Sequence, residues 1–295
     1  MNRRSFLFLF PASVVAKPSP VYSLDVSADG TIAAGLFRDV RIGTNVLTGH
    51  ADAVRAVAFS PDGKQLAAAG GNPGRKGELK VWDIASKQAI VTATGHSDAI
   101  YSAAFSPDGK TIATSSYDKL IKLWDASTGK ELRTLKDHID AVYSVAFTPD
   151  GKRLVSGAAD RSVKIWNPET GERLYTLSDA TDGINCVALD PKGQRVAAGG
   201  LDKTIRIWTL GATAGELQQT LIAHEDAILR VAWSPDGKTL ASGSSDRTIK
   251  RFNPDNMAEV AEPRRIKDWP QALKFAPNGT LHAGLFNGEI IEVPK

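Results

Sequence analysis

The chain has 295 residues, of which 42% are hydrophobic and 23% are charged, and its formal net charge is +3. These values predict an ordinary soluble globular protein and exclude disordered, collagen-like and membrane-embedded chains. The charge is small, and the Lys and Arg residues are spread along the chain, so nothing indicates nucleic-acid binding. The single cysteine, Cys186, excludes an intrachain disulfide, a four-thiolate zinc site and an iron–sulfur cluster. We expect Cys186 to be a small buried residue in a strand, and we predict no metal and no cofactor.

The N-terminal segment, residues 1–16, resembles a twin-arginine export signal. Arg3-Arg4 is followed by an apolar run to Val15-Ala16, with small or β-branched residues where a signal peptidase would cut. This interpretation favours an exported or periplasmic protein over a cytoplasmic one. No apolar stretch reaches about 18 residues, so we expect no membrane span.

A turn motif recurs seven times along the rest of the chain. Ser-Pro-Asp-Gly stands at 60–63, 106–109 and 234–237, a close variant at 148–151, and weaker copies at 27–30, 190–193 and 276–279. Pro presets φ, the Asp or Asn side chain bonds nearby backbone N–H groups, and Gly takes the positive φ. Alternating apolar runs such as 54–59 and 65–68 flank these turns and predict strands. No segment keeps a helical apolar period for three turns, so we expect an all-β protein.

A second hairpin follows in each repeat. Residues 115–124 contain a strand, a tight turn at Asp118-Lys119, and another strand that ends in Trp124; Thr134-Leu135 then predicts a fourth strand. Four strands in a unit of about 42 residues, repeated seven times, predict a β-propeller of seven four-stranded antiparallel blades. The first and last repeats, at 36–42 and 285–291, are degenerate and keep only the hairpin.

The repeats resemble those of the WD40 family over nearly the full length of the chain. Trp-Asp stands at 82–83 and 124–125, and Gly-His at 49–50 and 95–96. The resemblance implies a buried tetrad that joins a loop His, a second-strand Ser or Thr, the turn Asp and a third-strand Trp, and so pairs polar groups that would otherwise be unsatisfied. By spacing, the tetrads are His96, Thr114, Asp118 and Trp124; His138, Ser156, Asp160 and Trp166; and His224, Ser242, Asp246 and Phe252, the last one bond short because Phe has no N–H. His, Asp and Ser together resemble a hydrolase triad, but a set that recurs between buried strands is structural.

Two repeats depart from this pattern. The repeat that ends at Trp208 has Ala180 and Ala198 where His and Ser belong, so we expect its loop, residues 179–182, to be less anchored. The repeat before Trp82 carries an insertion, residues 70–77, in place of the Asp turn. We interpret it as a flexible basic loop, because a phosphate-binding loop would end in Gly-Lys-Ser/Thr and precede a helix.

The last repeat ends just after its third strand. In the WD40 family the N-terminus commonly supplies the missing fourth strand, and residues 6–15 are apolar enough to do so. Residues 1–16 are therefore either a signal peptide or a ring-closing strand, and residues 17–295 form a single propeller domain.

The resemblance implies a non-catalytic scaffold that mediates protein–protein interactions through the face with the Gly-His loops and Asp turns. In WD40 proteins the third residue after the loop Asp tends to project there, and large aromatic and Arg side chains are typical of interaction hot spots. The candidate rim residues are Tyr22, Arg55, Tyr101, Tyr143, Asn185, Leu229 and Gln271. We expect a protein or peptide partner and a monomeric propeller, and the regular repeats look bacterial.

Two further interpretations concern the same face. The alternative function is a propeller enzyme, a metal-dependent hydrolase or lactonase, which would need carboxylates and His converging on the channel. The first strands offer Arg, Tyr, Asn and Ala instead, and His282 is the one histidine outside the repeat register. A basic residue follows each turn Asp and could favour acidic peptides, although Lys or Arg there is the usual family choice and offsets the Asp. These residues are Lys119, Arg161, Lys203 and Arg247.

Overall fold

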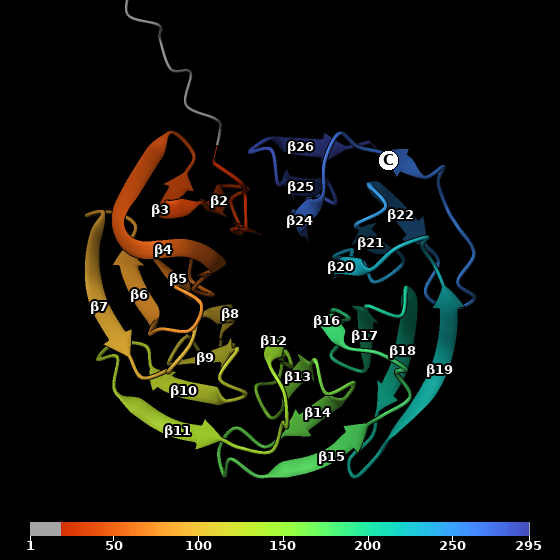
Figure 1. The fold of residues 1–295 in the computed structure, drawn as a ribbon, viewed down its shortest axis with the longest axis horizontal. Coiled ribbons are helices and arrows are strands. Elements are labelled where there is room, and N and C mark those ends of the chain that lie inside the picture. Colours follow the sequence, from red (N-terminus) through yellow and green to blue (C-terminus); the bar gives the residue numbers. More distant parts are fainter. Residues whose placement is uncertain (1–18, 295) are drawn as a thin grey trace, which may run out of the picture.

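The computed structural model describes residues 19–294. Within this range the regular secondary structure consists of β-strands, and the sheets are arranged in a ring around a central opening (Figure 1). The strands form six hydrogen-bonded sheets of antiparallel neighbours. The all-β propeller class predicted from the repeats is therefore confirmed. No helix in the described range is long and apolar enough to cross a membrane.

Neighbouring strands in each sheet follow one another in the sequence. The first sheet contains β1 (Ser23–Val26), β2 (Ile32–Gly35), β3 (Phe37–Ile42), β4 (Asn45–Phe59), β5 (Gln65–Gly71), β6 (Gly77–Asp83) and β7 (Gln88–Thr94). Four sheets have four strands each: β8 (Ile100–Phe105), β9 (Thr111–Ser116), β10 (Ile121–Asp125) and β11 (Glu131–Leu135); β12 (Val142–Phe147), β13 (Leu154–Ala158), β14 (Val163–Trp166) and β15 (Arg173–Leu177); β16 (Ile184–Leu189), β17 (Arg195–Gly200), β18 (Thr204–Leu210) and β19 (Gly215–Ile222); β20 (Ile228–Trp233), β21 (Leu240–Ser244), β22 (Thr248–Phe252) and β23 (Arg264–Arg265). The last sheet has β24 (Pro270–Phe275), β25 (Leu281–Leu285) and β26 (Ile290–Val293).

Strand β4 is shared by two units. Its residues 45–48 pair with β3, and its residues 54–59 pair with β5. Dividing the first sheet within β4 gives seven units in residues 19–294. The first unit then has four strands although its sequence is degenerate.

The innermost strands close the ring. These are β1, the C-terminal part of β4, β8, β12, β16, β20 and β24, and each packs against the next. Strand β1 also packs against β24, and the N–H of Val21 donates to the carbonyl of Leu285 at 3.1 Å. In the described range the last unit has three strands. The predicted signal peptide or closing strand, residues 1–16, lies outside the described residues.

Apolar side chains of adjacent units interlock to form the core. One cluster joins Leu79 of β6 to Ile100 of β8, Ile112 of β9 and Trp124 of β10, all of them buried. Each unit thus buries its apolar faces against its two neighbours, and its stability depends on them. Cys186 is buried in β16, and burial raises the pKa of its thiol to about 11, which keeps it protonated.

Candidate functional site

In three units a loop His lies beside a turn Asp, and we call the surface formed by these loops and turns (His96 and Asp118, His138 and Asp160, His224 and Asp246) the Gly-His face. In the unit of β8–β11, His96 Nδ1 is 2.9 Å from Asp118 Oδ2, and His96 Nε2 is 2.8 Å from the Thr114 hydroxyl. The Trp124 indole N–H donates to the same hydroxyl at 2.7 Å. That hydroxyl accepts from Trp124, so its own proton is available to Nε2, while Nδ1–H donates to the carboxylate. The four side chains form one buried chain of hydrogen bonds from the strand to the loop.

The other two sets of tetrad residues are brought together in the same way. His138 lies 2.7 Å from both Asp160 and Ser156, and the Trp166 N–H donates to Ser156 at 2.8 Å. Burial would raise the pKa of Asp160, but hydrogen bonds from His138 and Ser162 outweigh it and lower that pKa. The third set consists of His224, 2.9 Å from Asp246 and 2.7 Å from Ser242, and of Phe252, which has no N–H to donate.

The unit of β16–β19, whose third strand contains Trp208, corrects one expectation. Its loop at 179–182 is anchored despite Ala180 and Ala198, because Asp202 Oδ2 accepts hydrogen bonds from the backbone N–H and the hydroxyl of Thr181, both at 3.1 Å. The Trp208 N–H donates to Asp179 at 2.7 Å. Arg206, opposite Ala198 in the strand register, donates to Asp202 Oδ2 at 2.6 Å. A guanidinium thus takes the hydrogen bond that imidazole makes in the other units.

In the unit of β4–β7, which contains the insertion 70–77, the hydrogen bonds of the tetrad are incomplete. The inserted loop makes a hydrogen bond to the loop before β8, since the Gly74 N–H donates to Asp98 at 2.9 Å. His50 Nδ1 lies 2.9 Å from Glu78, which takes the place of the missing turn Asp. Ala68 stands where a Ser or Thr would complete the tetrad, and its side chain is fully buried. Within the described residues, His50 Nε2 and Trp82 Nε1 are therefore buried without a hydrogen-bond partner.

We expect Ala68→Ser to stabilise the protein. A hydroxyl at this position can accept from Trp82 and donate to His50, as Ser156 does between Trp166 and His138. Two recovered buried hydrogen bonds should add about 1 kcal/mol or more, which raises the Tm of a chain of this size by about 2–4 °C per kcal/mol. Thermal unfolding followed by circular dichroism measures the change.

The matched control is Ala198→Ser, at the same register position in the unit of β16–β19. There Trp208 already bonds to Asp179 and Ala180 offers no ring nitrogen, so the new buried hydroxyl should be neutral or destabilising. Equal Tm changes in the two variants would show that the unpaired His50 and Trp82 atoms are irrelevant to stability.

The predicted rim residues share a backbone feature. Arg55, Tyr101, Tyr143, Asn185, Leu229 and Gln271 are each skipped in the pairing register near the start of an inner strand. Each register shift is a β-bulge, and a bulge redirects its extra residue away from the ladder. The remaining rim residue, Tyr22, directly precedes β1. All seven side chains are half-buried.

Four of the predicted rim residues contact one another at the mouth of the channel. The Arg55 guanidinium lies over the rings of Tyr22 and Tyr101, 5.6 and 5.0 Å from their centroids. The Tyr101 ring packs edge-on against Tyr143 at 5.2 Å, and exposed Tyr117 lies 6.2 Å from Tyr101 on the outer side. Burial, with the neighbouring Tyr101, raises the pKa of Tyr143 to about 12, so its hydroxyl stays neutral.

A pocket of about 150 Å³ lies inside the channel at this mouth. Arg55, Tyr101, Tyr143 and Asn185 line it, whereas Tyr22, Leu229 and Gln271 do not. Arg230, the residue after Leu229, lines the pocket in its unit. The sequence offset of three residues missed Arg230, and the alternation of side chains after the bulge is the signal that would have found it.

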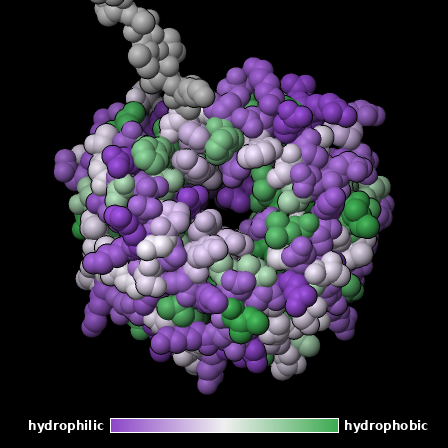
Figure 2. Space-filling view, in the orientation of Figure 1, coloured by the Kyte–Doolittle hydropathy of each residue, from purple (hydrophilic) through white to green (hydrophobic). Residues whose placement is uncertain are grey.

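The Gly-His face also carries exposed apolar and basic side chains. Tyr117 and Leu201 directly precede a turn Asp, and Ile139 follows a loop His; all three are exposed. Lys119, Arg161, Lys203 and Arg247 are exposed and adopt φ of 63–72°, the left-handed conformation of the turn. The face of the molecule drawn in Figure 2 has a central opening and small separate hydrophobic patches, not one continuous apolar surface.

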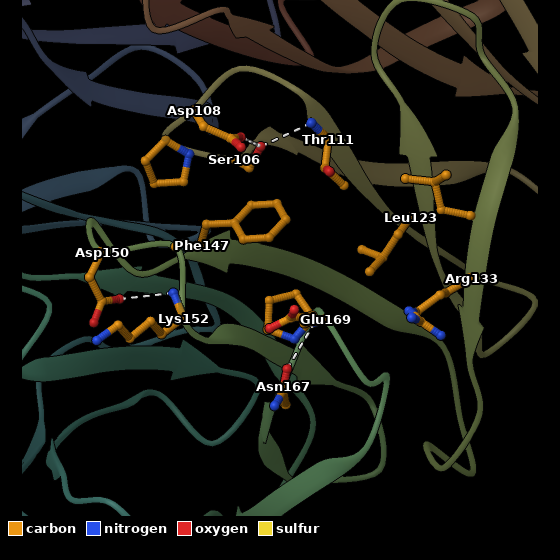
Figure 3. A pocket seen from close by; sticks show the side chains of 14 residues that line it. Ser106, Asp108, Thr111, Leu123, Arg133, Phe147, Asp150, Lys152, Asn167 and Glu169 are labelled. Atoms are coloured by element: carbon orange, nitrogen blue, oxygen red, sulfur yellow. Dashed lines mark hydrogen bonds between the residues drawn. The ribbon is translucent and has the colours of Figure 1, made fainter.

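A larger pocket, of about 1030 Å³, lies on the opposite face between the units of β8–β11 and β12–β15. Figure 3 shows that two of its carboxylates bond within their own turns: Asp108 accepts from the Ser106 hydroxyl, and Asp150 accepts from the N–H of Lys152. The Ser106 hydroxyl lowers the pKa of Asp108, and the Thr148 hydroxyl lowers that of Asp150. Carboxylates held in this way stabilise their own turns and are poor general acids at neutral pH.

Among residues 19–294, no group of three or more His, Cys, Asp or Glu side chains is placed to hold a metal ion. His282, the histidine outside the repeat register, is buried in β25 and pairs with Glu292 in the strand register.

The comparisons with known proteins agree with this architecture. The sequence model of the WD40 family, described as "WD domain, G-beta repeat", matches five segments: residues 42–83, 87–125, 129–167, 171–209 and 215–253. No curated protein matches the chain. The matched segments cover well over half of the sequence, and they contain the tetrads and the tryptophans described above. The chain belongs to the WD40 repeat family.

Proposed function

We propose that the protein is a scaffold that binds a protein or peptide partner on its Gly-His face, around the mouth of the channel. WD40 repeat domains are generally non-catalytic scaffolds for protein interactions. The observation that carries the proposal for this face is the contact chain Tyr22–Arg55–Tyr101–Tyr143. Clusters of Tyr and Arg give large contact areas at a low entropic cost, and they dominate binding energies at interfaces.

The surrounding residues support the same face. Tyr117, Ile139 and Leu201, beside the turn Asp and loop His residues, are large exposed side chains that could add separate apolar contacts. An interface typically combines a few central anchors with a mixed rim, and this face offers both.

We expect the double variant Tyr101→Ala and Tyr143→Ala to lose capture of the main partner. Both side chains are half-buried at the mouth and outside the tetrads, so the Tm should change by no more than about 2 °C. The measurement is affinity capture from the native host with each propeller as bait, followed by mass spectrometry and by thermal unfolding of each bait.

The matched control is Leu132→Ala with Leu174→Ala, two exposed residues on the outer strands β11 and β15. It removes apolar area away from the channel and should capture the partner as the unaltered protein does. A folded tyrosine variant that still captures the partner would show that another face binds it. Should the tyrosine variant unfold, exposed Tyr117→Ala is the second test of the same surface.

A further inference from the structure

Two arginines line the channel pocket without a carboxylate partner. Arg55 lies on β4 and Arg230 on β20, and these strands approach the opening from opposite sides (Figure 1). No Asp or Glu of residues 19–294 lines the pocket. By contrast, the buried cations Lys122 and Lys164 pair with Glu131 and Asp137.

Within residues 19–294, most N–H donors of the two guanidinium groups have no protein acceptor. The Nε of Arg55 is buried without a partner among the described residues, and the tyrosine rings that hold the group accept no ordinary hydrogen bond from it. Nη1 of Arg230 donates to the Leu229 carbonyl at 2.8 Å. Burial also lowers the pKa of Arg230, as expected for a positive charge removed from water and left without a counter-charge. A guanidinium carries five N–H donors, so most of them remain available in the pocket.

The neighbouring side chains add further donors. The hydroxyl oxygens of Ser102 and Ser144 accept the backbone N–H groups of Val145 and Val187, at 3.3 and 3.2 Å. Their O–H protons have no acceptor in the part of the chain that the structure describes. The pocket therefore combines two positive charges with hydroxyl donors, which is the environment that stabilises an anion.

The size of the pocket limits the anion. About 150 Å³ is well below the roughly 300–1,000 Å³ of cofactor and small-molecule sites, and it is sufficient for one side chain. Arg55, Tyr101 and Tyr143 of the contact chain line this pocket, so a group that enters it belongs to a molecule that also contacts the chain.

We propose that the channel pocket binds the carboxylate of a single Asp or Glu side chain presented by the partner, with Arg55 and Arg230 as its two cationic contacts. This inference rests on the proposed function and specifies its partner as an acidic segment. The planar guanidinium groups match the two oxygens of a carboxylate. Hydrogen bonds between these oppositely charged groups are stronger than hydrogen bonds between neutral groups.

The test is isothermal titration of the intact protein with an acetylated and amidated hexaglutamate peptide at low ionic strength. Hexaglutamate should bind and hexaglutamine should not, since the two differ only in their carboxylates. Arg55→Met and Arg230→Met should each weaken hexaglutamate binding at least tenfold, and the double variant should abolish it. Lys110→Met with Lys152→Met removes the same charge from exposed turns on the opposite face and should leave the affinity within twofold.

Stability separates the binding role from a structural one. Arg230 is half-buried and has no carboxylate partner in the pocket, so the Tm of Arg230→Met should be unchanged or higher, and lost binding cannot come from unfolding. Equal binding of hexaglutamate by the double arginine variant would overturn the inference. Binding of inorganic phosphate in the absence of hexaglutamate binding would overturn the assignment to a carboxylate.

Partner capture distinguishes the failure of the two proposals. If the tyrosine variant loses the captured partner and the double arginine variant keeps it, the carboxylate inference is wrong and the scaffold proposal stands. If both folded variants keep the partner, the Gly-His face is not the binding surface, and the two proposals fail together.

Discussion

Deletion of residues 267–295 is expected to give an aggregating protein and not a stable six-unit ring. Strand β24 packs between β20 and β1, and Leu273, Phe275 and Leu281 form a buried cluster of the last unit. Without this unit, the apolar faces of both neighbouring units meet water, and exposed apolar faces associate with other chains. Size-exclusion chromatography with light scattering measures the outcome.

The control for the deletion is Phe286→Ala in the same unit. Phe286 is exposed and contacts exposed Trp269, so its removal should leave a monomer with a Tm close to that of the intact protein. A soluble monomeric deletion variant with an unchanged Tm would contradict the closed ring of interdependent units.

Asp202→Ala is expected to destabilise the protein at least as much as Asp160→Ala. Asp160→Ala leaves the buried Nδ1–H of His138 without its acceptor, which costs about 1–3 kcal/mol. Asp202→Ala leaves the guanidinium of Arg206, whose side chain is 8% exposed, without its counter-ion, and breaking such a pair costs about 3–5 kcal/mol. Chemical denaturation gives the free energy of unfolding of each variant, and equal m values make the two losses comparable.

This order reverses the one that the sequence suggests. With Ala180 in place of the loop His, the Asp202 carboxylate has no expected imidazole partner, so its loss would be the smaller one. Arg206→Met is the informative control, because it removes the buried charge together with the ion pair and should cost less than Asp202→Ala. A smaller loss for Asp202→Ala than for Asp160→Ala would show that the ion pair contributes little to the folded state.

The sequence by itself determined the features that depend on short, fixed spacings. The Pro-Asp-Gly turns, the alternating strands between them and the 22-residue spacing from His138 to Asp160 all lie within a repeat, where hairpin geometry fixes which residues meet. The class of fold follows from these local signals, because units of this kind can bury their apolar faces only against copies of themselves. The third residue after each loop Asp, which the sequence identifies directly, lies at a β-bulge of an inner strand.

Only the tertiary structure decided which side chains share an environment across units. It joined Tyr22, Arg55, Tyr101 and Tyr143 from successive units, and it placed Arg230 in the channel pocket. It also showed Arg206 replacing a missing imidazole, and the unpaired atoms of His50 and Trp82 beside Ala68. A repeat spacing gives the position of each backbone segment, but the reach of a long side chain depends on the neighbours that surround it, and those neighbours come from distant parts of the chain.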